Sequence, residues 1–414
     1  MFVIDQMSDP ITLGALFLIL AAVLTTADST RPFWQKFYHY VPATLLCYFI
    51  PSLLNTFGLV DADNTALYPV VSRVLLPASL VLFTLSVDFK AFRRLGRKSI
   101  LMFAASAISI MLGGPLAVWA IAQVAPELVG GQGPDAVWRG LATLAGTWIG
   151  GGANQTALKE VFQPSSNLFS AIVTVDVFVS NLWLGALLYG AGHSVAIDRW
   201  LGADASAVEE VRQRIQNQVN AIRRIPSATD LIVILAVGFG ATAVAHALAD
   251  QIAPFIDRHS PLLSRFSLNA PFFWIVGLAT AIGIGLSFTK ARNLEGAGAS
   301  KVATVFLYLM IATIGLKMNI LAIADHPGLI LVGVVWMLLH VLMMIGFSRL
   351  IRAPFFFLAV GSQACIGGPA TAPIIAAAFH PVLAPVGVLM AILGYAVGTY
   401  MGYLCGILMQ LASP

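Results

Sequence analysis

Long apolar runs dominate the sequence, and they restrict the folds open to this chain more than any other feature. Many of them approach the ~20 residues that a helix needs to cross a bilayer. Only 10% of the 414 residues are charged, whereas soluble domains carry about 25%. We therefore expect an all-α polytopic membrane protein. The runs that we expect to cross lie at 11–26, 41–57, 68–89, 99–124, 168–192, 231–250, 271–289, 301–322, 327–349 and 383–410.

Two further apolar segments, 138–162 and 354–379, are interrupted by glycine. The first contains "GTWIGGGANQTA" and the second contains "GSQACIGGPATAP". Glycine breaks helices, and irregular backbone at membrane depth is tolerated only inside protein or beside a watery cavity. Gly151-Gly152 and Gly367-Gly368 are therefore candidate breaks. Each segment could be re-entrant or could be a discontinuous crossing helix.

The order of these features indicates an internal repeat. The two glycine breaks occupy corresponding places in an N-terminal repeat, 1–192, and a C-terminal repeat, 230–414. Between them lies a polar linker, 193–229, in which Ser206 and Glu209 could form the capping box of a surface helix.

The distribution of basic residues predicts how the halves are oriented. If both interrupted segments enter and return on one side, all the Lys/Arg clusters fall on the cytoplasmic side, as the positive-inside rule requires. We therefore expect two inverted repeats with a cytoplasmic linker. Each repeat would hold about five crossing helices plus one broken or re-entrant segment.

Polar side chains beside the breaks are the candidate solute contacts. A helix that restarts after a break presents free N–H groups and a positive dipole end. Two such ends near the midplane could bind an anion or another polar solute. The alternative is close helix packing through small residues. Besides the glycines of both breaks, the candidate residues are Thr147, Asn154, Gln155 and Thr156 from the first segment and Gln363 and Thr371 from the second.

Asp176 is an acid well inside the span that follows the first break. A charged group at a helix centre costs about 2.5–3.5 kcal/mol on insertion scales, so we interpret Asp176 as the carrier of a coupling cation or proton. Asn181 on the same span is a further candidate, and Na⁺ could bind near Asn154, Asp176 and Gln363. A structural hydrogen bond or a buried ion pair is the alternative role for Asp176.

The remaining features limit the chemistry. His340 lies in mid-span and could titrate near neutrality, although a structural role is more common for a lone histidine. Lys159 and Glu160 are expected at the surface end of the first interrupted segment. Metalloprotease, nucleotide-loop and nucleophile-elbow motifs are missing, and the three cysteines lack metal-ligand spacing. We therefore expect no enzyme, no cofactor and no nucleic-acid partner.

The paired glycine motifs and "TLSVDFK" (84–90) resemble the membrane family known as domain of unknown function 819. The resemblance runs over nearly the whole chain. That family is placed with the cation–proton antiporter and anion transporter superfamily, which includes bile-acid/sodium symporter-like proteins. The resemblance implies an inverted-repeat fold with core and panel domains, transport by movement of the core against the panel, and a homodimer. Relatives often carry an acid where Asp176 stands, but antiporters often place a second Asp or Asn before it, where this chain has Val175.

These observations predict a secondary active transporter in a bilayer, which we expect to be a bacterial cytoplasmic (inner) membrane. It would move a small organic solute, such as a carboxylate anion, with Na⁺ or H⁺. A monovalent cation/proton exchanger is the alternative. An integral-membrane enzyme or a channel is disfavoured, because clustered acids and histidines at one membrane face and a repeated pore-lining polar stripe are missing from the sequence.

Overall fold

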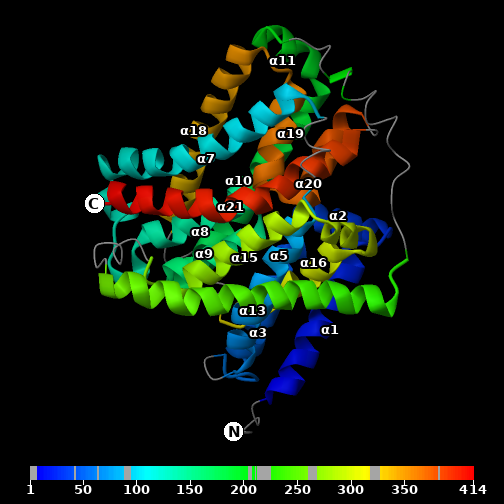
Figure 1. The fold of residues 1–414 in the computed structure, drawn as a ribbon. Coiled ribbons are helices and arrows are strands. Elements are labelled where there is room, and N and C mark those ends of the chain that lie inside the picture. The colour runs from blue at the N-terminus through cyan, green and yellow to red at the C-terminus, as the bar shows by residue number, and fades with distance from the viewer. Residues whose placement is uncertain are drawn as a thin grey trace.

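The computed structural model describes residues 7–41, 43–62, 65–87, 95–203, 208–209, 211, 225–259, 268–317, 327–380 and 383–414. Over these residues every regular element is helical and no strand occurs. Figure 1 shows the arrangement, in which α7, α21 and α13 run across the view. The expected all-α class is therefore confirmed.

The first part of the chain forms helices close to the predicted runs. They are α1 (Asp9–Ala27), α2 (Pro32–Tyr40), α3 (Ala43–Thr56), α4 (Leu67–Val70), α5 (Leu76–Leu85), α7 (Arg97–Ala122), α8 (Val137–Gly150), α9 (Gly152–Phe162) and α10 (Ser166–Gly192). A π-helical turn, Val71–Leu75, joins α4 to α5. Two 3₁₀ turns, Pro126–Leu128 and Gly133–Asp135, lie between α7 and α8.

The second part follows a similar order of elements. Its helices are α11 (Ser194–Leu201), α13 (Ala228–His259), α15 (Pro271–Ser287), α16 (Ala299–Gly315), α18 (Gly328–Ile351), α19 (Phe355–Ile366), α20 (Gly368–Phe379) and α21 (Ala384–Ala412). A 3₁₀ helix, Lys290–Ala297, lies between α15 and α16.

Several helices have the length and hydropathy of membrane spans. Seven qualify among the described residues, and an eighth results if α15 is joined to Lys290–Ala297, which is bent from it by 96°. The mean hydropathy of the best window reaches 2.5 in α18. Together with the all-helical fold, these helices define a polytopic membrane protein.

The structure differs from the predicted elements in several places. Helix α2 lies between two predicted runs. Helix α13 continues to His259, well beyond residue 250, and holds Arg258 in its last turn. Helix α11 was not predicted, and Asp198 on it accepts a hydrogen bond from the Phe355 N–H at 2.7 Å. Burial raises the pKa of the Asp198 carboxyl, and this hydrogen bond opposes the rise. The surface helix predicted from Ser206 lies almost entirely outside the described residues.

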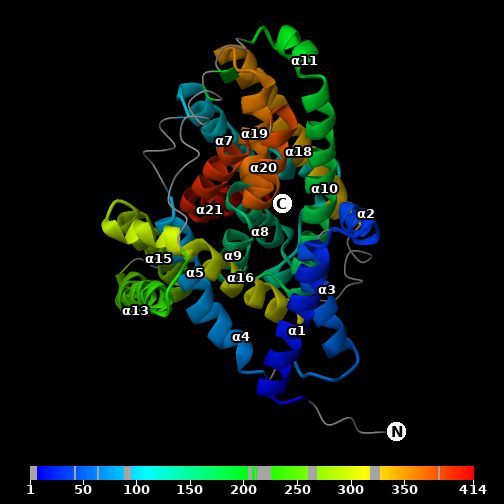
Figure 2. The same ribbon diagram turned by 90° about the vertical axis from the view of Figure 1, so that its right-hand side faces the viewer.

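The helices pack as two bundles. We call the first the core bundle: α7 packs on α18 and α19, α8 packs on α9 and α21, and α20 packs on α21. We call the second the panel bundle, which contains α1, α3, α5, α13, α15 and α16. Figure 2 shows the panel helices below and to one side of the core helices.

Helix α21 lies directly against α8 because glycine removes the side chains between them. A Cβ on Gly398 would lie 2.6 Å from the Cα of Gly150, and one on Gly402 would lie 3.2 Å from the Cα of Gly146. Such backbone contact is typical of small residues spaced four apart in membrane helices. The stripe on α21 comprises Gly394, Gly398, Gly402 and Gly406.

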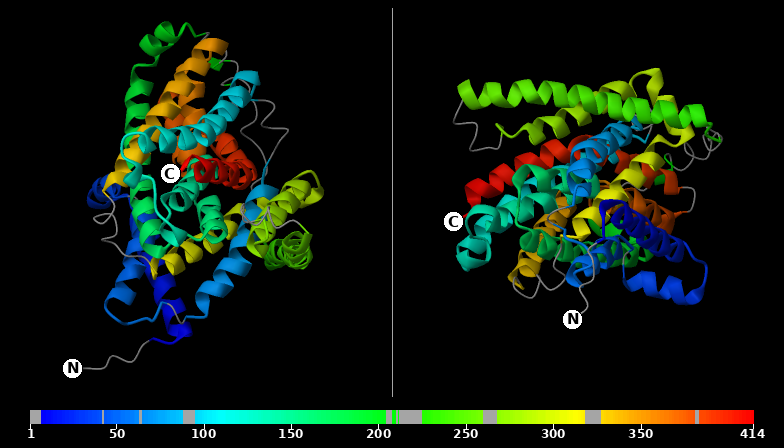
Figure 3. Two further views of the ribbon diagram at one scale, coloured as in Figure 1. Left: turned by 90° about the vertical axis from the view of Figure 1, so that its left-hand side faces the viewer. Right: turned by 90° about the horizontal axis from the view of Figure 1, so that it is seen from below.

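Three segments that carry basic clusters meet at one end of the core bundle. Lys98 Nζ at the start of α7 donates to the carbonyl of Arg352 at 3.0 Å. The Arg349 guanidinium lies 3.8 Å from the ring centre of Trp200. Figure 3 shows that α11 and the neighbouring ends of α7 and α18 share this end of the molecule. These three basic segments therefore lie close together at one end of the core bundle.

Candidate solute and ion site

The first interrupted segment folds as a helical hairpin. Gly151 joins α8 to α9 with φ 79° and ψ −178°, a conformation that essentially only glycine adopts. At the other end, Arg139 on α8 donates to the carbonyl of Phe162 on α9. The Ser165 N–H donates to the Pro134 carbonyl at 2.9 Å. The entry and exit of this segment therefore lie side by side, and the glycines form its tip.

The second interrupted segment has the same shape. Helices α19 and α20 meet at Gly367 and Gly368, and Gly368 has a φ of 59°. The ring centres of Phe355, which opens α19, and Phe379, which closes α20, are 5.9 Å apart. Entry and exit again lie together. Both glycine breaks thus turn the chain back instead of interrupting a straight helix.

The two hairpin tips approach each other across α21. A Cβ on Gly394 would lie 2.8 Å from the carbonyl oxygen of Ile149 and 3.7 Å from that of Ala364. Ile149 belongs to the first hairpin and Ala364 to the second. The next residue, Tyr395, stacks on Phe83 of α5 with ring centres 4.2 Å apart. The meeting point therefore lies beside the panel bundle.

Asp176 on α10 lies beside the tip of the first hairpin. Its Oδ1 accepts hydrogen bonds from Trp148 Nε1 at 2.9 Å and Ser180 Oγ at 2.8 Å. Its Oδ2 accepts from Thr147 Oγ1 at 3.3 Å. In the part of the chain that the structure describes, no basic side chain pairs with this carboxylate. The acid therefore has donors around it, and the described residues supply no basic counter-ion.

Asn154 and Thr156 both bond to backbone carbonyls beside the first break. Asn154 is fully buried, and its Nδ2 donates to the Gly150 carbonyl at 2.7 Å. Its Oδ1 accepts from the Thr399 hydroxyl of α21. Thr156 Oγ1 donates to the Gly152 carbonyl at 2.9 Å. Both side chains are thus occupied by protein partners and stabilise the tip.

Gln155 and Gln363 have buried polar atoms without hydrogen-bond partners among the described residues. Their side chains are 3% and 1% exposed. Gln363 Nε2 donates to Thr371 Oγ1 at 2.6 Å, but Gln363 Oε1 and Gln155 Nε2 have no hydrogen-bond partner in the part of the chain that the structure describes. Since buried polar groups are normally paired, these two atoms make Gln155 and Gln363 candidates for contact with a bound molecule.

Asn181 was predicted to belong to the site, but the structure does not place its side chain with those at the hairpin tips. Its side chain is exposed, and Nδ2 donates to the Val177 carbonyl of its own helix at 2.7 Å. Sequence reasoning in turn missed Trp148 and Ser180. The four-residue spacing from Asp176 to Ser180 was an available signal, because side chains at that spacing share a helix face.

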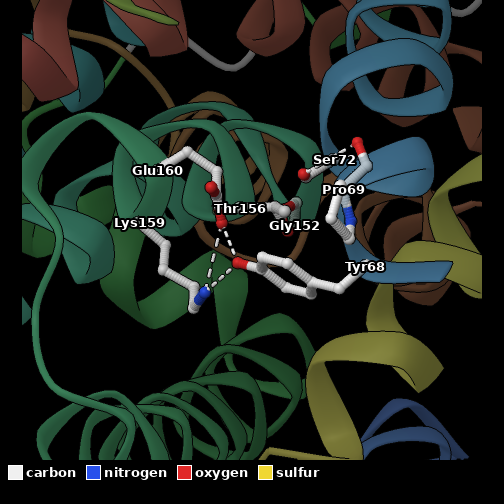
Figure 4. Close-up of polar contacts among 7 residues, drawn as sticks. All are labelled: Tyr68, Pro69, Ser72, Gly152, Thr156, Lys159 and Glu160. Atoms are coloured by element: carbon white, nitrogen blue, oxygen red, sulfur yellow. Dashed lines mark hydrogen bonds and ion pairs between the residues drawn. The ribbon is translucent and has the colours of Figure 1, made fainter. Parts of the chain in front are cut away.

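A half-buried polar cluster joins the first hairpin to α4, which leads through the π-helical turn into α5 of the panel bundle, as Figure 4 shows. The Tyr68 hydroxyl of α4 donates to Glu160 Oε1 and accepts from Lys159 Nζ. Lys159 and Glu160 also pair at 3.1 Å, with side chains 13% and 18% exposed. Lys317 Nζ lies 4.7 Å from the centre of the Tyr68 ring. The pair is therefore more buried than a surface position would allow.

His340 is the centre of a fully paired network in the core bundle. Its Nδ1 lies 2.7 Å from Ser109 Oγ, and its Nε2 lies 2.8 Å from Ser362 Oγ. The Ser109 hydroxyl donates to the Ser106 carbonyl, and Trp183 Nε1 donates to Ser362 Oγ. Nδ1 must then be the donor to Ser109, and Nε2 the acceptor from Ser362. A neutral imidazole satisfies every group, which favours the structural role.

The long apolar helices and the glycine-tipped hairpins define the class of this molecule as a helical integral membrane protein. The chain belongs to the family described as "Protein of unknown function (DUF819)", whose sequence profile matches residues 14–411. It is similar to the "Uncharacterized membrane protein YjcL" of Bacillus subtilis (strain 168), with 24% identity over 355 residues. The similarity covers 83% of this chain and 84% of the relative. The family resemblance carried by the glycine motifs is therefore confirmed.

Proposed function

We propose that this protein is a secondary active transporter. A small organic solute binds where the two hairpin tips meet, and Na⁺ or H⁺ binds at Asp176. The observation that carries the proposal is the approach of Ile149 and Ala364 to Gly394, with unpartnered atoms of Gln155 and Gln363 in the two tips. Binding sites of this kind occur where discontinuous segments from two repeats meet.

The helix ends at the tips favour an anionic solute. Helices α9 and α20 both begin at the tips, at Gly152 and Gly368, and neither start has a side-chain cap. The first N–H groups of a helix lack intrahelical partners and carry the positive end of its dipole. These uncapped helix N-termini suit a carboxylate, whose oxygens would accept hydrogen bonds from the backbone N–H groups and from Gln155 Nε2.

The hydrogen bonds of Asp176 indicate how it would hold a coupling ion. Oδ1 is occupied by two donors, whereas Oδ2 has only the longer contact from Thr147. Oδ2 is therefore the freer oxygen for Na⁺ or a proton. Gln363 Oε1 is a second free oxygen, whereas Asn154 Oδ1 is already occupied by Thr399.

Alternating access would come from movement of the core bundle against the panel bundle. The order of long helices and one hairpin occurs in both halves, which supports the inverted-repeat arrangement. In this arrangement both hairpins are re-entrant, the linker is cytoplasmic, and the panel bundle mediates a homodimer in the bacterial inner membrane.

A monovalent cation/proton exchanger is the second candidate. The absence of a basic partner for Asp176 in the described residues favours it, because such a carboxylate could alternate between a proton and a metal cation.

Uptake by proteoliposomes tests the proposal. Radiolabelled mono- and dicarboxylates are offered under inward Na⁺ or H⁺ gradients, while a pH-sensitive dye reports the lumen. A transporter accumulates at least one carboxylate only when a gradient is present, and Asp176→Asn abolishes this accumulation. Asp250→Asn, an exposed acid on α13, is the matched control. Na⁺-driven proton release without solute uptake would support the exchanger, and neither response in any gradient would refute both.

A further inference from the structure

A cavity of about 270 Å³ lies between α10, α11, α18 and α19, away from the hairpin tips. Its lining is apolar and includes Leu187, Ile197, Trp200, Val341, Ile345 and Leu358. The Trp183 indole also lines it, but its N–H is used by Ser362. A water occupies about 30 Å³ in the liquid and needs polar partners to be held. The cavity has room for several waters but offers them no partners, so it suits an apolar occupant.

Helix α11 forms one wall of this cavity and is held in place from two sides. Asp198 accepts from the Phe355 N–H of α19 at 2.7 Å. Arg349 of α18 donates to the Trp200 carbonyl at 3.4 Å. The outer face of α11 is apolar too, since Val195 is 68% and Trp200 57% exposed. A short helix with apolar side chains outward beside charged ones is typical of the membrane interface.

Basic residues lie on or next to two of the helices that line the cavity, α11 and α18. Arg199, Arg349 and Arg352 have exposed side chains, and the Arg349 guanidinium lies over the Trp200 ring. Tyr189, at the rim, is 73% exposed. Tyr and Trp with basic residues around an apolar opening match the chemistry of a phospholipid, whose acyl chain is apolar and whose phosphate accepts from guanidinium groups.

We propose that this cavity holds an acyl chain of an anionic phospholipid, with the phosphate bound by Arg349 beside Trp200. The lipid occupies the space between the linker helix α11 and the second hairpin, and it stabilises their contact. This site is separate from the hairpin tips and does not depend on the transport proposal.

Two variants separate the acyl-chain site from the headgroup site. Ala186→Trp fills the cavity from an exposed position on α10, and Leu188→Trp places the same ring on α10 outside the lining. Arg349→Gln removes the charge of the phosphate contact, and Arg258→Gln on α13 is its control. Thermal unfolding of each purified variant verifies that it is folded.

Native mass spectrometry of the delipidated full-length protein measures binding. The protein is titrated with phosphatidylglycerol and, separately, with phosphatidylcholine. The wild type should retain one phosphatidylglycerol that Ala186→Trp loses and Leu188→Trp keeps. Arg349→Gln should weaken phosphatidylglycerol binding about fivefold, as one basic contact predicts, and weaken phosphatidylcholine binding less, because the choline cation offsets the charge of its phosphate. Equal retention by Ala186→Trp and the wild type would overturn the cavity as the lipid site. Equal phosphatidylglycerol binding by Arg349→Gln and the wild type would overturn the role of Arg349.

Discussion

The indole Nε1 of Trp148 donates a hydrogen bond to Asp176 Oδ1 at 2.9 Å. Trp148 is fully buried and lies two residues before Gly150, on the first hairpin. Its ring also packs against Trp336 of α18, with ring centres 4.9 Å apart. The proposed ion-binding carboxylate and the proposed solute-binding tip are thus joined by one side chain, so a shift of the tip would change the environment of Asp176.

Trp148→Phe tests this link. The change removes a hydrogen bond to a charged acceptor, which is worth about 1.5–3 kcal/mol, and it keeps an aromatic ring. Because the donor stabilises the ionised carboxylate, its loss favours the protonated form. If the coupling ion is H⁺, we expect half-saturation of uptake at roughly tenfold lower H⁺ concentration. The change should be smaller for Na⁺, because the carboxylate stays ionised when Na⁺ binds. Trp138→Phe, at the other end of α8, is the control. An unchanged half-saturation in Trp148→Phe would show that the bond does not tune the site.

Gly398→Ala tests the contact between α21 and the first hairpin. The added Cβ would lie 2.6 Å from the Cα of Gly150, so backbone must move. Overpacking of this kind costs about 1–3 kcal/mol, and we expect a lower melting temperature. Gly346→Ala on α18, where a Cβ meets nothing within 4 Å, should have no cost, because alanine favours helices by about 1 kcal/mol over glycine. Equal melting temperatures for the two variants would contradict the close packing.

Gly151→Ala tests the turn at the tip. The φ of 79° and ψ of −178° place an alanine in a region that costs about 1–3 kcal/mol. We expect lower thermal stability and loss of solute uptake, because the tip must rearrange. Gly152→Ala has no positive φ and its Cβ would meet open space, so its melting temperature should stay at the wild-type value. The prediction fails if Gly151→Ala melts like Gly152→Ala.

Tyr68→Phe tests the cluster between hairpin and panel. It removes the hydroxyl that contacts Lys159 and Glu160 but leaves their direct ion pair. Partly unsatisfied buried charges cost about 1–3 kcal/mol, so thermal unfolding should shift downward. Tyr189→Phe, at an exposed position, is the matched control. A downward shift of the same size in both variants would exclude a specific role for the cluster.

His340→Asn separates a structural histidine from a proton carrier. The variant breaks the contacts to Ser109 and Ser362 and should lower the melting temperature. The pH profile of uptake should keep its shape, because both imidazole nitrogens are already held in hydrogen bonds to serines and the neutral form satisfies them. His246→Asn on α13, a half-buried residue whose Nε2 lies 2.8 Å from the Arg73 carbonyl, is the control. A displaced pH profile in His340→Asn alone would assign His340 to the coupling chemistry.

The sequence allowed the helices, the two breaks and Asp176 to be predicted, because each has a strong local signal. Glycine pairs and a lone acid are conspicuous in apolar runs, and hydropathy locates the spans. The extension of α13 was missed because polar residues from Asp250 onward resemble the end of a span. In the structure these residues continue the helix to His259.

The partners of the site residues could not be predicted, because they depend on how distant helices pack. Asn154 bonds to Thr399, which is far along the chain, so its structural role became visible only with α21 in place. Tyr68 likewise lies far from Glu160 in sequence. In both cases the residue type indicated that the side chain would form hydrogen bonds, but the identity of its partner depends on tertiary packing.

The glycine stripe of α21 also has a consequence for biogenesis. Gly398 must reach Gly150, yet α21 is translated long after the first hairpin. At about 5–20 residues per second, the first hairpin waits roughly 12–50 s for the helix that covers it. During that interval lipid, the translocon or a chaperone must cover the amides of the hairpin that α21 later buries. Quality control in the cell should therefore act on chains that end before α21. A ribosome that stalls before it translates α21 would release a protein whose first half is already inserted but whose first hairpin lacks the helix that covers it.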